Sequence, residues 1–152
     1  MSWSLRLARP ADAAAMPDIA ADSPRTAEDY GRLIRKGHSL VSHVGEALAG
    51  VLVAEPFRRE LHIWELCVSP AYRRRGIGRG LVRAALIDAR NTGVKALTLT
   101  TDREDSAPFF AQLGFEEVTA LDAHIRLAGE LAVEVDNGLD ADRRCAMICF
   151  LD

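Results

Sequence analysis

The chain has few cysteines and no arrangement of them that suggests a framework. Cys67, Cys145 and Cys149 are an odd number in apolar surroundings, which excludes a full set of disulfides and favours free thiols in a reducing compartment. Cys145 and Cys149 lack the C-x-x-C spacing, and the four histidines are scattered along the sequence. We therefore expect no structural zinc site and no metal cofactor.

Positive charge is not in excess, and long apolar runs are lacking. The 19 Lys and Arg stand against 22 Asp and Glu, a net charge of −3, whereas nucleic-acid binders usually carry a basic surface. No apolar run approaches the ~20 residues that span a bilayer, and the start of the chain lacks the apolar core of a secretory signal. These absences predict a cytoplasmic protein with neither a nucleic-acid partner nor a membrane partner.

What is present is enough for one folded unit. At 152 residues and 49% hydrophobic composition, the chain is long enough to bury a sizeable core. No internal repeat or low-complexity linker divides it. We therefore predict one domain over residues 1–152.

The most informative stretch is a basic turn punctuated by glycine. It follows an apolar run that ends at Val68, and it leads into a helical stretch that begins at Leu81. Glycines let main-chain N–H groups converge, and a helix N-terminus adds positive potential, so a strand, a turn and a helix in this order favour a pyrophosphate site. The lysine of the nucleotide-triphosphatase loop is missing, and the third glycine is wrongly spaced for a dinucleotide fingerprint. The predicted phosphate-binding residues are Arg73, Arg74, Arg75, Gly76, Ile77, Gly78, Arg79 and Gly80.

This turn resembles the acetyl-CoA loop of GNAT-type N-acetyltransferases. Residues 73–78 fit the pattern Gln/Arg-x-x-Gly-x-Gly/Ala position by position, and Val68-Ser69-Pro70 precede them as is common in that family. A second family element, an aromatic pair followed by Gly-Phe, is matched by Phe109-Phe110 and Gly114-Phe115. The two elements in this order are far more specific than either one alone.

The resemblance implies a fold and a reaction. The fold is α/β (α+β), a GNAT-like domain with a mixed, mostly antiparallel twisted sheet of about six or seven strands and about four flanking helices. The implied co-substrate is acetyl-CoA, a coenzyme A thioester, and the acetyl group moves by direct transfer to a primary amine of a small molecule, amino acid or peptide. The family further implies that pantetheine pairs with the backbone near Leu66, Cys67 and Val68, where a main-chain N–H stabilises the oxyanion.

Two side chains on the strand 61–68 are candidates for the general base. Glu65 interrupts an apolar run, and a carboxylate in apolar surroundings binds a proton more readily. An exposed position, or a pair with an arginine, is the alternative for Glu65. His62 is the second candidate, with a surface position at the strand start as its alternative. A water chain that needs no single residue also stays open. We expect the helix 26–36 and the loop 56–60 to shape the acceptor pocket.

The general acid is in doubt. Many family members carry a Tyr where this chain has Phe110, which has no proton to give and must pack against pantetheine or the core. An alkyl thiol has a pKa near 8.5, so its thiolate leaves tolerably without a dedicated acid. Tyr30 and Tyr72 are substitutes, although packing roles are favoured for both. An acyl-CoA-binding regulatory domain with weak or lost turnover is therefore the alternative function, and a homodimer stays open.

Periodicity predicts the order of the elements. The segment 115–142 is the hardest to interpret, because eight Asp and Glu face a single Arg. A solvated connection is favoured there over an acidic rim that attracts a cationic amine. Asp12 is expected to cap the first helix, which Pro17 bends, and Thr26 to cap the second. The expected strands are 3–7, 39–44, 47–55, 61–68, 94–101 and 145–151, and the expected helices are 12–21, 26–37 and 78–91.

Overall fold

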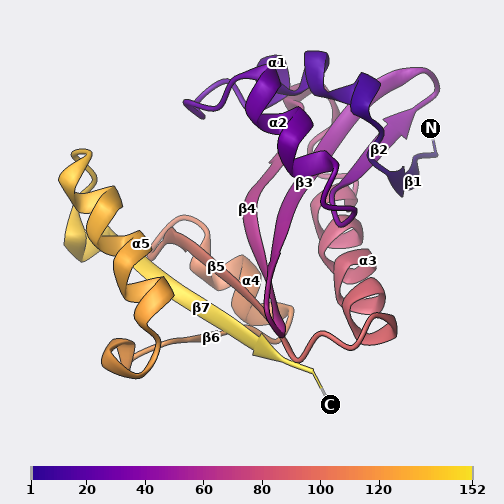
Figure 1. The fold of residues 1–152 in the computed structure, drawn as a ribbon. Helices are drawn as coiled ribbons and strands as arrows, with labels where there is room; N and C mark the ends of the chain where they lie inside the picture. Colours follow the sequence, from indigo (N-terminus) through magenta and orange to yellow (C-terminus); the bar gives the residue numbers. More distant parts are fainter. Residues whose placement is uncertain (1, 152) are drawn as a thin grey trace.

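The computed structural model describes residues 2–151, which build one seven-stranded sheet in the order β1-β2-β3-β4-β5-β7-β6 (Figure 1). All neighbouring strands pair antiparallel except β4 and β5, which are parallel. This is the mixed, mostly antiparallel sheet expected. The strands are β1 Ser4–Leu7, β2 Leu40–Val44, β3 Ala47–Phe57, β4 Glu60–Val68, β5 Ala96–Asp102, β6 Glu116–Glu117 and β7 Arg144–Phe150. The helices are α1 Met16–Ile19, α2 Ala27–Ile34, α3 Ile77–Asn91, α4 Ala107–Gln112 and α5 Ile125–Asp136, with short 3-10 turns at Pro10–Ala15, Pro70–Tyr72, Leu121–Ala123 and Ala141–Arg143.

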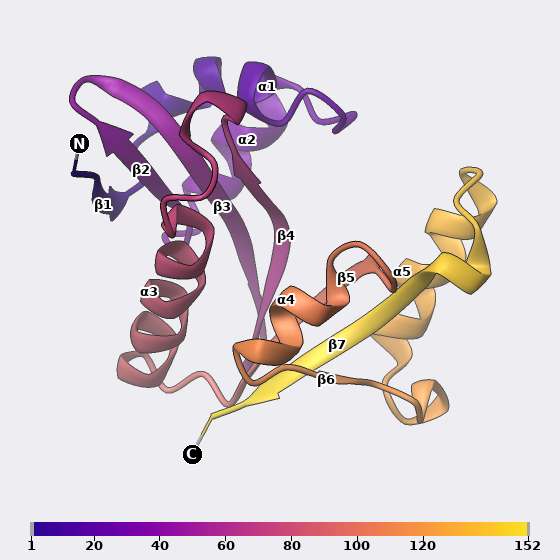
Figure 2. The same cartoon turned by 180° about the vertical axis from the view of Figure 1, so that it is seen from behind.

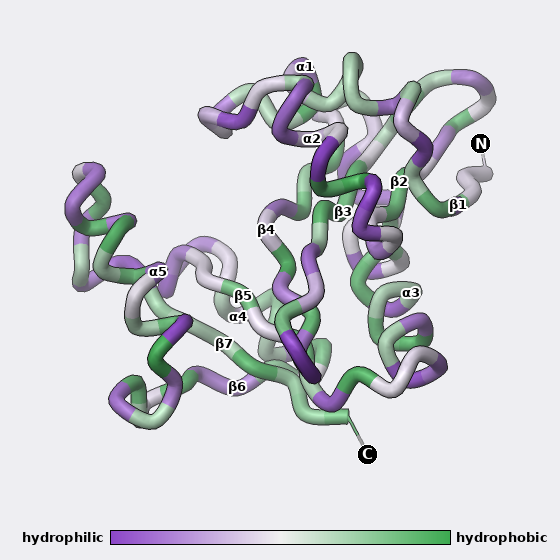
Figure 3. Tube along the Cα trace, viewed as in Figure 1, coloured by the Kyte–Doolittle hydropathy of each residue, from purple (hydrophilic) through white to green (hydrophobic). Residues whose placement is uncertain are grey.

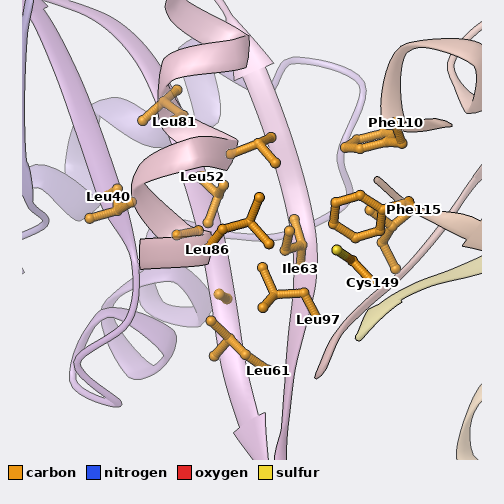
Figure 4. Packing of buried hydrophobic residues seen from close by; sticks show 14 of the residues in the cluster. Leu40, Leu52, Leu61, Ile63, Leu81, Leu86, Leu97, Phe110, Phe115 and Cys149 are labelled. Carbon is orange, nitrogen blue, oxygen red and sulfur yellow. The ribbon is translucent and has the colours of Figure 1, made fainter. Parts of the chain in front are cut away.

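The first half of the sheet buries both of its faces. Along β3, Leu52 and Ala54 point into the cluster beneath α3, whereas Val51 and Val53 point into the cluster beneath α1 and α2. Strands buried on both sides read as continuous apolar runs, which explains why β3 was easy to predict. Figure 4 shows side chains of the α3 cluster, which continues past β4 to Phe110 and Phe115.

Strands β4 and β5 pair over only part of their length. The parallel ladder joins Glu60–Ile63 to Ala96–Leu99 and stops there. In Figure 1, β4 then continues towards α1, whereas β5 and β7 turn away towards α5. A bulge accompanies the parting, because Val53 pairs with Glu65 while Ala54 pairs with Ile63, which leaves one extra residue, Trp64, on β4. Bulges bend a strand and re-aim its side chains.

The first helical segment begins differently from the expectation. Asp12 is not the cap itself but the third residue of the turn, where its carboxylate accepts a hydrogen bond from the Arg9 backbone at 2.7 Å. Arg6 holds the same carboxylate, and this hydrogen bond lowers the pKa of Asp12. A 3-10 turn changes to α-helix at Met16, next to the predicted bend. Thr26 caps α2 as predicted.

The segment 115–142 is not a plain solvated connection. It contains α5, a helix of 12 residues that sequence patterning missed. The amphipathic signal is weak because Leu127 is the one fully buried side chain described on α5, whereas Ile125 and Val133 are 85% and 58% exposed. Figure 3 shows hydrophobic and hydrophilic residues mixed along this helix. Much of its contact with the sheet is polar.

Three structural findings concern membrane spans, metal sites and cysteines. Within residues 2–151 no helix is long and apolar enough to cross a membrane. The same residues contain no group of three or more His, Cys, Asp or Glu side chains placed to hold a metal ion. All three cysteines are free; Cys145 and Cys149 are buried, whereas Cys67 is half-buried.

Candidate functional site

The predicted phosphate loop has the backbone that such a site requires. After the turn Pro70–Tyr72, Arg74 takes a left-handed conformation with a φ of 67°. Gly76 takes another, with a φ of 81°, and stands at the N-cap of α3. A residue with a Cβ is strained at such an angle, so glycine suits this position. The chain turns sharply twice between β4 and α3 (Figure 2).

The main-chain amides of this loop are free. No N–H from Arg73 to Arg79 donates to a protein acceptor within residues 2–151, and the first such bond is from Gly80 to Gly76 O, at 2.9 Å. The free groups stand at the N-terminus of a helix of 15 residues, whose dipole favours an anion. The arginine side chains at 73, 74, 75 and 79 are exposed around them. The loop therefore fits a pyrophosphate.

Contacts from distant segments hold the loop in place. Trp3 Nε1 donates to Arg75 O at 2.9 Å, which ties the N-terminal segment to the loop. The Arg75 guanidinium lies 5.4 Å from the centre of the Tyr72 ring. Ile77, 1% exposed, anchors the loop in the core below. Sequence reasoning missed Trp3, since nothing local connects position 3 with position 75.

The glycines of the motif serve different purposes. A Cβ on Gly80 would stand 2.4 Å from the Trp3 ring, so Gly80 is small because the indole packs on the helix. Its amide is already bonded to Gly76 and is not free for a ligand. Gly78 has ordinary space, with Phe109 and Val68 both 3.7 Å from an added Cβ. Gly76 is required for its backbone conformation.

Beyond Ile63, where β4 and β5 diverge, one edge of β4 lacks a partner strand. Residues 64–68 lie past the last pair with β5, so their groups on that side are open to a ligand within the part of the chain described. Leu66 and Val68 pack towards α3, whereas Cys67 packs towards α1. A cavity of ≈ 280 Å³ adjoins these residues and Arg73. The predicted pantetheine-binding stretch therefore lies beside the phosphate loop.

Glu65 lies in a polar setting, not the apolar one expected. Its side chain is 7% exposed and is paired with Arg25 at 2.8 Å, the alternative that the sequence left open. Ser23 Oγ and Tyr30 Oη donate to it at 2.9 and 2.8 Å. The Arg25 guanidinium also stacks 5.0 Å from the Trp64 ring. The Oε1 oxygen of this carboxylate accepts a hydrogen bond only from the Tyr30 hydroxyl. It can therefore accept a hydrogen bond from another donor.

His62 is buried, not a surface residue. It is 1% exposed, and its Nδ1 lies 2.8 Å from Thr98 Oγ1 and 3.1 Å from Arg126 Nη1. Since two donors face Nδ1, the ring hydrogen belongs on Nε2, which is 3.0 Å from a Glu130 carboxylate oxygen. Burial acts to raise the pKa of Glu130, but contacts with His62 and Arg126 outweigh it and lower the value. The His62 ring packs 4.4 Å from that of Trp64.

A second, larger cleft of ≈ 960 Å³ lies between the diverging strands, with Trp64 and Glu65 of β4 on one side and Thr100 of β5 on the other. It shares Asp22, Ser23 and Glu65 with the smaller cavity, so the two meet at these residues. Neither helix 26–36 nor loop 56–60, which were predicted to shape the acceptor pocket, lines this cleft. That loop lines a separate groove with the start of α5, and α5 forms the wall of the cleft. The cleft is lined by Asp22, Ser23, Pro24, Arg25, Trp64, Glu65, Thr100, Arg126, Gly129, Glu130, Val133, Glu134, Asn137, Leu139 and Arg144.

Neither Phe110 nor Tyr30 is well suited to act as a general acid. Phe110 is 7% exposed in the core, where it stacks edge-on with Phe109 and Phe115. Burial, with the neighbouring Glu65, raises the pKa of Tyr30 to about 12. Burial and nearby carboxylates raise the pKa of Cys67 to about 11, so its thiol stays protonated at neutral pH and is a poor nucleophile.

The geometry agrees with comparisons to known proteins. The family model described as acetyltransferase (GNAT) family matches residues 9–115. The chain belongs to this family. At 35% identity over 95 residues, 62% of the chain is similar to the N-alpha-acetyltransferase RimI of Mycobacterium tuberculosis (strain ATCC 25618 / H37Rv), and it covers 57% of that protein's length. The family match includes the phosphate loop and ends before β6 and α5.

Solved structures show the same fold. N-acetylglutamate synthase from Neisseria gonorrhoeae, complexed with coenzyme A and N-acetyl-glutamate, is 18% identical with a TM-score of 0.81 over 100% of this chain and 36% of its own. Ard1 from Thermoplasma volcanium is 20% identical with a TM-score of 0.79 over 100% of this chain and 99% of its own. The GNAT-like fold expected from the sequence is confirmed.

Proposed function

We propose that this GNAT protein is an acetyl-CoA-dependent N-acetyltransferase that moves an acetyl group directly to a primary amine. The observation that carries the proposal is the opened edge of β4 beside a loop of free amides. A long, thin ligand with a diphosphate needs both features next to each other. The gonococcal synthase of the same fold was solved in complex with coenzyme A, which supports the assignment.

The loop from Arg73 to Arg79 would hold the diphosphate by its amides, and the arginine side chains would add charge. Backbone groups of residues 64–68 would align the pantetheine arm. The thioester supplies the acetyl group. A main-chain N–H on the open edge of β4 would stabilise the oxyanion, a contribution of about 3 kcal/mol where such donors have been removed elsewhere.

Glu65 is the proposed general base. It stands where the two cavities meet, and its Oε1 has room to accept a proton from the acceptor ammonium. The neutral amine then forms the C–N bond and its nitrogen loses a second proton to water, while the C–S bond breaks and the thiolate leaves with the electron pair. The thiolate takes its proton from water, because Phe110 has none to give. Arg25, Ser23 and Tyr30 position the carboxylate.

His62 is not proposed as the base. Its ring is buried below Trp64 and its nitrogens face Thr98, Arg126 and Glu130. An acceptor amine does not reach it without displacing these partners. We assign His62 to the support of the cleft floor.

The test is calorimetry with acetyl-CoA, followed by release of free coenzyme A thiol with a panel of amines. We expect a one-to-one complex and turnover that depends on the amine. Absence of any complex at millimolar acetyl-CoA would refute the donor site. Binding without turnover by any amine would instead favour the acyl-CoA-binding regulatory domain, which the missing hydroxyl at Phe110 supports.

A further inference from the structure

The ≈ 960 Å³ cleft is the proposed acceptor cleft. Each of its three arginines is already paired with a protein carboxylate. Arg126 is 2.9 Å from Glu130, and Arg144 is 3.0 Å from Glu134. The third, Arg25, is the partner of Glu65. A carboxylate on the substrate would therefore have to compete with a protein carboxylate for any guanidinium it reached. Like charges brought together in this way cost binding free energy.

One acidic side chain of the cleft has no such match. Asp22 is exposed and has no cationic group within 4 Å among residues 2–151. It stands with Glu65 where the two cavities meet. Asp22 therefore leaves an uncompensated negative charge beside Glu65, where the acceptor nitrogen is proposed to bind. This charge suits an ammonium group and opposes a carboxylate on the adjoining carbon.

The cleft also offers apolar side chains on α5 and just after it, and it is roomy. Val133 and Leu139 line it and are 58% and 47% exposed, and Trp64 forms part of the floor. The volume of ≈ 960 Å³ lies in the range of about 300–1,000 Å³ that holds a drug-sized molecule. A very small amine would leave these apolar side chains in water, so a bulky apolar group gains most from the wall that α5 provides.

We propose that the acceptor is a primary amine with an apolar body and no carboxylate beside the amine. This proposal rests on the proposed function and specifies its substrate class. The amine lies at Asp22 and Glu65, and the apolar body lies along Val133 and Leu139. Free α-amino acids are excluded by charge, whereas their amides and simple aralkylamines are accepted.

Three compounds with the same aromatic body test the charge rule. Phenethylamine, L-phenylalaninamide and L-phenylalanine differ at the carbon beside the amine. We measure kcat/KM by thiol release and correct each value for the fraction of protonated amine, the form proposed to bind at Asp22 and Glu65. Both compounds without a carboxylate are expected to exceed phenylalanine by about 30-fold or more. Glycinamide, which lacks the apolar body, is expected about 10-fold below phenylalaninamide.

A pair of variants tests the placement. Asp22→Asn should raise KM for phenethylamine about 10-fold and shrink the disadvantage of phenylalanine. Asp18 is an exposed carboxylate outside both cavities. Asp18→Asn makes the same charge change and should leave the KM for phenethylamine and the disadvantage of phenylalanine unchanged. Val133→Asp should slow phenylalaninamide more than glycinamide.

The outcomes separate this inference from the function beneath it. Phenylalanine turned over as fast as its amide, with acetylation intact, would overturn the acceptor class alone. Equal effects of Asp22→Asn and Asp18→Asn would overturn the placement of the amine. No thiol release with any amine would overturn the proposed function and this inference together.

Discussion

The proposed donor and acceptor halves of the site are built in different ways. The donor half is one continuous stretch from β4 to α3, and its proposed ligand contacts are mostly main-chain groups. The acceptor half is assembled from the loop 22–25, from β4 and β5, and from α5 and β7. Side chains make up its surface, and many of them are charged. The donor half thus depends on backbone conformation, and the acceptor half depends on electrostatic pairing between distant segments.

The largest expected effect tests the acceptor half. Glu65→Gln should lower kcat/KM by about 100- to 1,000-fold at neutral pH and leave the affinity for acetyl-CoA nearly unchanged, because the donor contacts are elsewhere. The measurement is thiol release with one amine at a fixed neutral pH, beside calorimetry with acetyl-CoA. Arg25→Met removes the ion pair but keeps the carboxylate, so it should lose less activity. A kcat/KM for Glu65→Gln equal to that of the unchanged protein would contradict the assigned role.

The next effect tests the donor half. Gly76→Val places a β-branched residue at a φ of 81°, which should distort the amides and raise the Kd for acetyl-CoA about 100-fold, or about 2.7 kcal/mol. Gly93→Val is the matched control, because Gly93 has a φ of 78° and nothing within 4 Å of an added Cβ, as at Gly76. Both variants lose stability, but only the first should lose affinity in calorimetry. Equal affinities of the two variants for acetyl-CoA would contradict the proposal that this loop binds the diphosphate.

A smaller effect tests whether charge holds the acceptor wall. Glu130→Gln should lower the free energy of unfolding by about 1–2 kcal/mol at pH 7, because the contacts with His62 and Arg126 lose a charge. Since the folded state lowers the pKa of Glu130, this stabilisation is complete above the unfolded value near 4.3 and fades as pH falls through the lower folded value. Urea unfolding at pH 7, 5 and 3.5 is the measurement. The difference in unfolding free energy between the unchanged protein and Glu130→Gln should become smaller as the pH falls.

The control for that variant is Glu104→Gln, whose side chain is 70% exposed. Its unfolding free energy should change by less than about 0.5 kcal/mol at each pH, as is usual for exposed ion pairs. If the difference in unfolding free energy between the unchanged protein and Glu130→Gln stays constant with pH, α5 is held by packing instead of by charge.

The smallest effect concerns the support of the donor loop. Gly80→Ala should displace the Trp3 ring, 2.4 Å from the new Cβ, and cost about 1 kcal/mol of unfolding free energy with a change in tryptophan fluorescence. Trp3→Phe, which removes the hydrogen bond to Arg75 O but keeps an aromatic ring, should cost less. An unchanged melting temperature in Gly80→Ala would mean that the indole does not pack on α3.

The sequence by itself determined the family and the class of sheet, and it predicted the donor loop. Gly76, the basic turn and the apolar run before it are local features, and local conformation and hydrogen bonding follow from neighbouring residues. Leu52 and Val51 likewise show a buried strand without any knowledge of its partners.

Only the tertiary structure decided the acceptor half. Glu65 was expected in an apolar setting, but Arg25 and Tyr30 reach it from 40 and 35 residues away. A surface position was an open alternative for His62 at the strand start. The helix α5 that covers it was not predicted, because many of its contacts are charged and its apolar side chains Ile125 and Val133 face outward. Charge pairs between segments far apart in the chain leave no periodic trace, so they become visible only when the fold brings the partners together.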